Sequence, residues 1–314
     1  MDSVQTTYLI FGLVLLVAVI FDLGLLSKKS HNISIKEASW QTIFWIALAM
    51  AFFLFVWFQN GQTVAIEYIS AYLMEWSLSI DNIFVFLLIF SFFNIKKEYY
   101  GRVLLLGILM AIIFRIIFIT IGIALVNNFY WILYFFGAFL IYTGIKMFFV
   151  SHDNEFDPEK NIVYRVIKKI LPVANTDAGG KYTTRIGGKK YFTLLFVVVI
   201  MLATTDIVFA LDSIPAVFAI TQNKMVIYTS NIFAVLGLRS LFFLLRGAVN
   251  KFDYLQEGIA IVLIFVGAKM LIEYFDIHIP TLVSLAVIIV FLGGSIIFSL
   301  YNKKPGLSGK SKHK

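Results

Sequence analysis

Long apolar runs alternate with short polar breaks along the chain, and nine of these runs are long enough to cross a membrane. A membrane-spanning helix needs about 20 predominantly apolar residues. The nine predicted segments cover residues 7–26, 40–58, 64–93, 103–126, 129–149, 192–220, 226–247, 255–275 and 281–301. The pattern therefore predicts an all-α fold: a polytopic membrane protein of about nine transmembrane helices embedded in a lipid bilayer.

Composition supports this class of protein. Hydrophobic residues make up 60% of the 314 residues and charged residues only 14%, whereas a soluble domain has roughly 25% charged residues. The chain has no cysteine, which excludes disulfides and thiolate metal sites. The net charge of +8 does not indicate nucleic-acid binding, because excess Lys and Arg in a membrane protein follows topology. We expect no nucleic-acid partner.

Basic residues predict the orientation of the helices. Segments that follow alternate spans carry 21 of the 26 Lys and Arg residues, and the segments on the opposite side carry one, Lys224. Cytoplasmic loops are the ones enriched in Lys and Arg. We therefore expect a multi-pass protein of the cell inner (plasma) membrane, with the N-terminus outside and the C-terminus in the cytoplasm.

Two segments of the chain resemble each other. "EWSLSIDNIFVF" (Glu75 to Phe86) and "DIVFALDSIPAV" (Asp206 to Val217) each have an acid, five intervening residues, and an Asp followed by a small polar residue. Each is followed by an arginine in the next span and by a Gly-x-Lys-Met motif in the third. The repeated unit has three spans, so its second copy enters the membrane from the opposite face, as in transporters built from inverted repeats.

The repeat divides the chain into five expected parts. These are two N-terminal helices (1–60), repeat 1 (61–150), a basic cytoplasmic loop (151–191), repeat 2 (192–276), and the last helix with a Lys-rich tail (277–314). In the loop region, "KYTTRIGGKKYFT" (Lys181 to Thr193) predicts a β-hairpin around Gly187-Gly188. This loop is either a solvated connector or a regulatory flap.

Charged residues within the predicted spans are the candidate functional site. An ionised carboxylate at the bilayer centre costs at least about 2.5–3.5 kcal/mol. The chain balances four in-span acids with four in-span bases that we assign to charge balance or gating: Glu75, Asp81, Asp206 and Asp212, against Arg115, Arg239, Lys146 and Lys269. They are either ion pairs that hold helices together or an ion-binding site. Asn82 and Ser213 follow the second acid of each pair and add oxygen donors, which favours the ion-binding interpretation.

Helix geometry constrains such a site. Residues six apart are separated by about 240° on an ideal helix, so Glu75 and Asp81 do not share a face. Both acids of a pair reach one site only if the helix unwinds locally. Pro215 lacks an N–H to bond the Leu211 carbonyl, so we predict a helix break beside Asp212, with that carbonyl as a further ligand.

The ligand types limit the choice of ion. All four histidines fall in loops or the tail, whereas carboxylate, amide and carbonyl oxygens favour Mg²⁺, Ca²⁺ and Mn²⁺. Met74 is either a soft ligand that favours Mn²⁺ or a core residue. The oxygen donors alone leave the three ions open.

The chain resembles the TerC family of membrane proteins, in particular its nine-span Alx-type branch. The resemblance starts at "FDLGLLSKKSHNISIKEASWQTIFW" (Phe21 to Trp45) and is strongest in the stretches that contain "SIDN" and "ALDSIPA" and in "YTSNIFAVLGLRSLFFLL" (Tyr228 to Leu245). It implies links to manganese efflux, tellurite (tellurium) resistance and membrane assembly, with the four acids lining an ion path. Many relatives in this family carry a glutamate where this chain has Ala203. The resemblance implies that the loss of this carboxylate affects the affinity for the ion, or the ion or proton stoichiometry of transport.

These observations favour a secondary transporter that exports divalent metal cations, above all Mn²⁺, through a midplane carboxylate site, coupled to protons by alternating access. We expect no enzyme activity and no cofactor. The chain lacks a Walker-type phosphate loop, and it has no Gly-x-Gly-Asp segment of an intramembrane aspartyl protease. The alternative is a non-transporting scaffold, assembly or tellurite-resistance factor.

Overall fold

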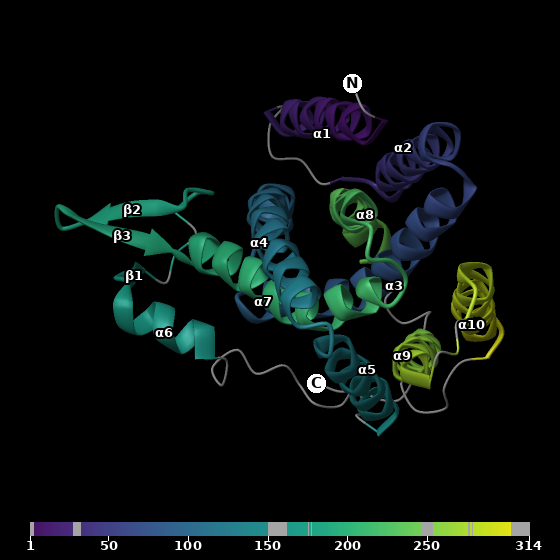
Figure 1. Ribbon diagram of the computed structural model, residues 1–314. Helices are drawn as coiled ribbons and strands as arrows, with labels where there is room; N and C mark the ends of the chain where they lie inside the picture. Colours follow the sequence, from purple (N-terminus) through teal and green to yellow (C-terminus); the bar gives the residue numbers. More distant parts are fainter. Residues whose placement is uncertain are drawn as a thin grey trace.

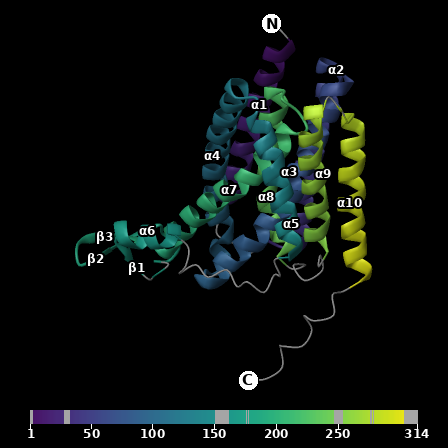
Figure 2. The same ribbon diagram turned by 60° about the horizontal axis from the view of Figure 1, so that its bottom comes forward.

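The computed structural model describes residues 3–27, 33–149, 162–174, 176, 178–246, 254–275, 277 and 279–302. Within these residues, nine helices have 18 or more residues: α1 (Ser3–Ser27), α2 (Ile35–Asn60), α3 (Gln62–Phe92), α4 (Tyr100–Asn128), α5 (Ile132–Phe149), α7 (Leu194–Phe218), α8 (Lys224–Leu245), α9 (Leu255–Ile272) and α10 (Thr281–Tyr301). They pack into a bundle in which most axes run in broadly the same direction and α7 is inclined (Figure 2).

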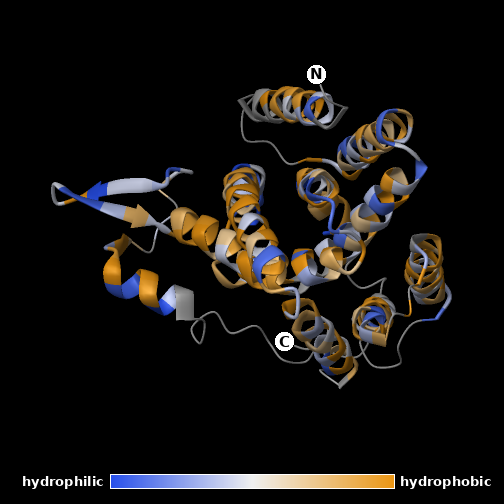
Figure 3. Ribbon diagram, viewed as in Figure 1, coloured by the Kyte–Doolittle hydropathy of each residue, from blue (hydrophilic) through white to orange (hydrophobic). Residues whose placement is uncertain are grey.

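Six helices of the described chain are long and apolar enough to cross a membrane: residues 35–60, 97–128, 194–218, 224–245, 257–275 and 282–299. Residues 5–17 and 132–148 form shorter apolar helices. The all-α, multi-pass class of the prediction is therefore confirmed, whereas the count of nine spans and the inverted repeats stay predictions. Apolar residues cover much of the bundle's helices (Figure 3), as contact with lipid requires.

Helices of the first predicted repeat pack mainly against helices of the second. The most extensive contacts join α5 to α9, α3 to α8 and α4 to α7. Helix α8 contacts α2, α3 and α4 (Figure 1), and 19 of its 22 residues are buried. The three helices after Gly61 and the three before Glu273 thus form one shared interior.

Glycines bring α5 and α9 into direct backbone contact. A Cβ atom on Gly267 would lie 2.5 Å from the carbonyl oxygen of Gly137, and one on Gly144 would lie 2.7 Å from that of Ala260. Small residues permit such close approach of membrane helices. Gly144 and Gly267 are the glycines of the two Gly-x-Lys-Met motifs, so these motifs mark this helix contact.

The segment between α5 and α7 contains a small structured unit. Helix α6 (Ile162–Ile170) precedes a three-stranded sheet in the order β1-β3-β2, and the unit projects sideways from the bundle (Figures 1 and 2). Strand β1 (Val173–Ala174) runs parallel to β3 (Lys189–Thr193), and β2 (Thr183–Ile186) runs antiparallel to β3. The predicted hairpin is confirmed, with Gly187 and Gly188 at φ 57° and 81°.

Two short 3₁₀ helices lie elsewhere in the chain. η1 (Lys97–Tyr99) precedes α4, and η3 (Glu273–Phe275) follows α9.

Helix α7 differs from the prediction at Pro215. The predicted break is wrong, because α7 is a continuous α-helix from Leu194 to Phe218 with Pro215 inside it. Proline removes a single bond near the end of the helix, and the following turn is held by Ala219 N–H, which donates to the Pro215 carbonyl over 3.1 Å. Helix α3 is likewise continuous from Gln62 to Phe92, so the chain unwinds at neither acid pair.

Candidate functional site

Four helices bring polar side chains together inside the bundle. Glu75 and Asn82 come from α3, Arg115 from α4, Asp206 from α7 and Asn231 from α8, and each is at most 2% exposed. We call these five residues the polar centre. Glu75 and Asn82 are seven residues apart, so they lie on one face of α3 without any unwinding.

The Arg115 guanidinium joins the two halves of the molecule. Its Nε and Nη2 donate to Asp206 Oδ2 and Oδ1 over 2.8 and 3.0 Å, which is the bidentate geometry of strong Arg–carboxylate pairs. Its Nη1 contacts Glu75 Oε1. One cation therefore bridges the first acid of predicted repeat 1 and the first acid of predicted repeat 2.

Two amides complete this arrangement. Asn231 Oδ1 accepts from Arg115 Nη1 over 3.1 Å, while Asn231 Nδ2 donates to the Ile227 carbonyl in the preceding turn. Asn82 Nδ2 lies 3.5 Å from Asp206 Oδ1. The amides orient the charged groups and supply two of the hydrogen bonds that buried ions require.

Three buried oxygens near this region lack a hydrogen-bond partner among the described residues. They are Glu75 Oε2, Ser79 Oγ and Ser213 Oγ. Ser79 lies one helical turn after Glu75 and Ser213 two turns after Asp206, so each serine shares a face with the acid before it. Buried polar atoms are nearly always bonded, which indicates that these oxygens retain capacity for another ligand.

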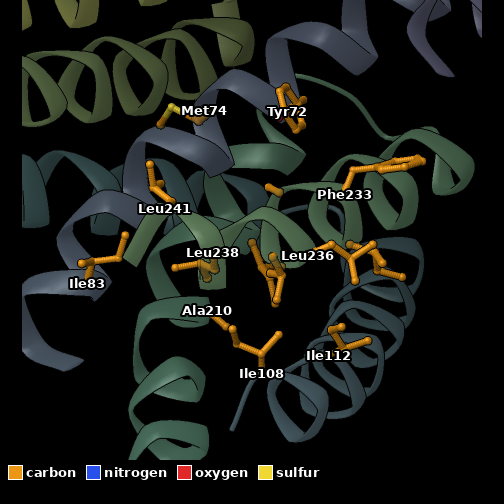
Figure 4. Close-up of a cluster of buried hydrophobic side chains, with 14 of the residues drawn as sticks. Tyr72, Met74, Ile83, Ile108, Ile112, Ala210, Phe233, Leu236, Leu238 and Leu241 are labelled. Carbon is orange, nitrogen blue, oxygen red and sulfur yellow. The ribbon is translucent and has the colours of Figure 1, made fainter. Parts of the chain in front are cut away.

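The four helices that carry the polar centre also bury apolar side chains against one another. Figure 4 shows a cluster of such residues, among them Met74 and Ile83 of α3, Ile108 of α4 and Ala210 of α7. Met74 is fully buried and belongs to the hydrophobic core. Low local polarity strengthens every charge interaction here, and it equally raises the cost of leaving one charge unpaired.

The structure brings together some of the predicted site residues and separates others. Ser213 is buried, and Arg239 is buried in α8 with contacts of its own. The side chains of Asp81 and Asp212 lie outside the described residues. Among the residues that are described, no group of three or more His, Asp or Glu side chains is placed to hold a metal ion.

Lys146 and Lys269 do not join the polar centre, which corrects their assignment as charge-balancing partners of these acids. Lys146 is exposed in the last turn of α5. Lys269, in the last turn of α9, lines a separate cavity. Long basic side chains near helix ends extend toward the polar boundary, and positive charge suits a helix C-terminus.

This separate cavity, the end pocket, lies where α3 begins and α7 and α9 end. Its volume is about 210 Å³, and its polar lining includes Glu67, Thr221, Lys269 and Glu273. Thr221 Oγ1 donates to Glu67 Oε2 over 2.5 Å. The predicted orientation puts the pocket on the outer side of the membrane.

Sequence reasoning missed Asn231 and Ser79. The signal for Asn231 was present in "YTSNIFAVL" (Tyr228 to Leu236), where three consecutive polar residues interrupt an apolar run. A polar residue inside a membrane helix is usually functional or bonded to another helix.

Comparison with known proteins agrees with the fold class. The model of the integral membrane protein TerC family matches residues 60–306. An uncharacterized membrane protein of Myxococcus xanthus is 44% identical over 283 residues, which are 90% of this chain and 88% of that protein. An uncharacterized membrane protein of Rickettsia felis is 43% identical over 95% of this chain and 98% of its own. A protein of Escherichia coli, named as a putative membrane-bound redox modulator, Alx, is 38% identical over 92% of both chains. No solved structure matches the chain.

Proposed function

Since this chain belongs to the TerC family of integral membrane proteins, we propose that it is a secondary transporter that exports divalent metal cations, with Mn²⁺ as the leading substrate. The protein would act in the cell inner membrane, with its N-terminus outside and its C-terminus in the cytoplasm. Mg²⁺ and Ca²⁺ are the other candidate substrates, because carboxylate, amide and hydroxyl oxygens suit all three ions.

One observation carries the proposal: a buried guanidinium bridges carboxylates from both repeats. Glu75 and Asp206 are 131 residues apart in sequence, yet both contact Arg115. The pair of carboxylates is a binding site for positive charge, and Arg115 fills it in this conformation. A dication that reaches the centre would take these carboxylates, with Ser79 and Ser213 as further oxygen donors, while Arg115 withdraws.

Exchange of the ion for protons follows from the same groups. A protonated carboxylate no longer holds a metal cation, so lowering the pH weakens binding of the ion and favours its release. The three-helix units α3–α5 and α7–α9 would expose the centre alternately to the two sides. On the outer side, the end pocket with Glu67 and Glu273 would receive the released ion.

The direct test is Mn²⁺ uptake into everted membrane vesicles. We expect uptake by the unmodified protein to fall as the pH is lowered, and to be lost in Glu75→Gln, Asp206→Asn, Asp81→Ala and Asp212→Ala. Glu98→Gln is the matched control, because Glu98 is an exposed carboxylate outside the long helices. Full uptake by the Glu75 or Asp206 variants would refute the proposed site.

All three guanidinium nitrogens of Arg115 are hydrogen-bonded, which favours a second candidate, a scaffold or assembly factor in which the polar centre only holds helices together. A tellurite-resistance factor belongs to the same alternative. The triple variant Glu75→Gln, Arg115→Gln and Asp206→Asn removes all three charges together and leaves neutral hydrogen-bonding groups. If the folded triple variant supports full function, the charges are structural. Unchanged cellular manganese after gene deletion, together with a defect in membrane-protein insertion, would favour the scaffold.

A further inference from the structure

The unit formed by α6 and the three-stranded sheet is strongly basic. Residues 162–193 contain seven Lys and Arg residues and a single acid, Asp177. The unit is anchored to the bundle: the Tyr164 ring lies 5.2 Å from that of Phe93, and the Phe192 ring lies 4.5 Å from that of Phe196 in α7. The transmembrane helices therefore keep the unit close to the membrane surface.

Helix α6 has two contrasting faces. At 100° per residue, its apolar residues cluster on one side, and Arg165, Lys168 and Lys169 cluster on the other. Tyr164 and Ile167 fill the part of the apolar face that packs inward. Val166 and Ile170 extend this face and are 46% and 71% exposed. Exposed apolar side chains beside basic ones are typical of helices that lie in the membrane interface.

The tip of the hairpin places like charges opposite each other. Arg185 pairs with Lys190 across β2 and β3, and the next pair is Ile186 with Lys189. Like charges directly across a sheet destabilise it, and an anion between them removes this cost. Ile186 is 52% exposed, so the tip repeats the combination of basic and apolar side chains found on α6.

From these features we propose that the α6–sheet unit binds anionic phospholipid headgroups of the adjacent leaflet, with Val166 and Ile170 entering the interface. The unit projects sideways near the N-terminal end of α7 instead of extending along the bundle axis (Figure 2), so it lies over the lipid that surrounds the bundle. A nucleic acid would match the charge but not the exposed isoleucines. This inference is independent of ion transport.

Full-length protein in lipid nanodiscs tests the proposal. The chain has no cysteine, so a nitroxide at Ile170→Cys reports on this one position. Its accessibility to oxygen, relative to that of a water-soluble nickel complex, is measured in phosphatidylethanolamine with phosphatidylglycerol and in phosphatidylcholine alone. Tyr301→Cys, an 84% exposed position at the end of α10, controls for changes in the bilayer itself.

We expect the label at Ile170→Cys to be lipid-immersed in phosphatidylglycerol nanodiscs. It should become water-accessible in phosphatidylcholine, and also in about 1 M salt, where the Debye length is about 3 Å. Removal of one lysine, as in Lys168→Gln or Lys190→Gln, should lower the ratio of the membrane-bound to the released state of the α6–sheet unit about fivefold. Lys224→Gln, at the opposite end of the bundle, should leave it unchanged.

Equal accessibility in both lipids would overturn the proposal, as would immersion that persists in phosphatidylcholine at high salt, because neither involves anionic headgroups. A label that stays in water until nucleic acid or an acidic protein is added would overturn it in favour of that partner. None of these outcomes alters Mn²⁺ uptake by the polar centre, so failure here is distinguishable from failure of the proposed function.

Discussion

In the polar centre, α3, α4, α7 and α8 meet around buried ions, whereas α5 and α9 meet around glycines. The first contact depends on Arg115 and its two carboxylates. In the second, the atoms nearest to Gly137, Gly144 and Gly267 belong to backbone, isoleucine, leucine and methionine. Both contacts join one predicted repeat to the other, but the buried ion pairs of Arg115 belong to the first.

This difference bears on what the charges are for. At the described glycines of the α5–α9 contact, helices from the two halves join through backbone and apolar side chains. Replacing a buried ion pair by apolar residues is often neutral or stabilising, so packing alone does not account for the polar centre. The proposed ion binding would account for both the presence of the acids and their convergence on one cation.

Asp206→Ala should destabilise the protein more than any single change at the α5–α9 contact. It leaves Arg115 without its bidentate partner in an apolar interior, which costs about 3–5 kcal/mol. Thermal unfolding in detergent should show a large loss of stability, and Mn²⁺ uptake should disappear. A variant as stable as the unmodified protein would mean that Arg115 has another partner or reaches water.

Gly267→Val tests the charge-free contact. A side chain here meets the Gly137 carbonyl at 2.5 Å and Ile141 at 2.9 Å, and overpacking of this kind costs about 1–3 kcal/mol. Gly294→Val in α10 is the matched control, because its Cβ meets nothing within 4 Å. Equal thermal stability of the two variants would contradict the backbone contact between α5 and α9.

Asn231→Ala removes one hydrogen bond to the guanidinium but keeps both carboxylates. The expected loss of stability is about 1.5–3 kcal/mol at most, the range for hydrogen bonds to charged groups. Uptake should be reduced but not abolished, because Glu75 and Asp206 remain. Complete loss of uptake in a well-folded variant would assign Asn231 a direct role with the ion.

Lys146→Gln should have the smallest effect. Its side chain is exposed at the end of α5, and exposed substitutions usually change stability by no more than about 0.5 kcal/mol. Both unfolding temperature and Mn²⁺ uptake should match those of the unmodified protein. A strong loss of uptake would return Lys146 to the charge-balancing role that its sequence position indicates.

Much of the helical architecture could be predicted because membrane helices depend on one simple property, the length of an apolar run. The convergence of Glu75 and Asp206 inside the bundle was also predictable. Buried charged groups require partners of opposite charge, and the predicted repeat places these two acids at equivalent positions. Helix α6 was missed, although its apolar residues recur with helical spacing beside a basic face. Its nine residues are too few to stand out beside the spans.

The predictions for Pro215 and for the two lysines were wrong because each applied a rule for single residues without regard to the position of the residue in its helix. Proline disfavours a helix interior, but Pro215 lies in the last turns of α7, where little of the helix remains to be disrupted. The charge balance grouped Lys146 and Lys269 with the midplane acids, although both lysines lie in the last turn of their helices. Their position near the ends of the spans was visible in the sequence, and it decides where such side chains reach.

The touching backbones of α5 and α9 also limit how the bundle moves. With no side chains between them at Gly137 and Gly267, these helices have no room to slide or separate without losing the contact. We expect them to serve as a pivot about which the remaining helices rock. A crosslink between them would then leave the transport cycle intact, whereas one between α3 and α8 would arrest it.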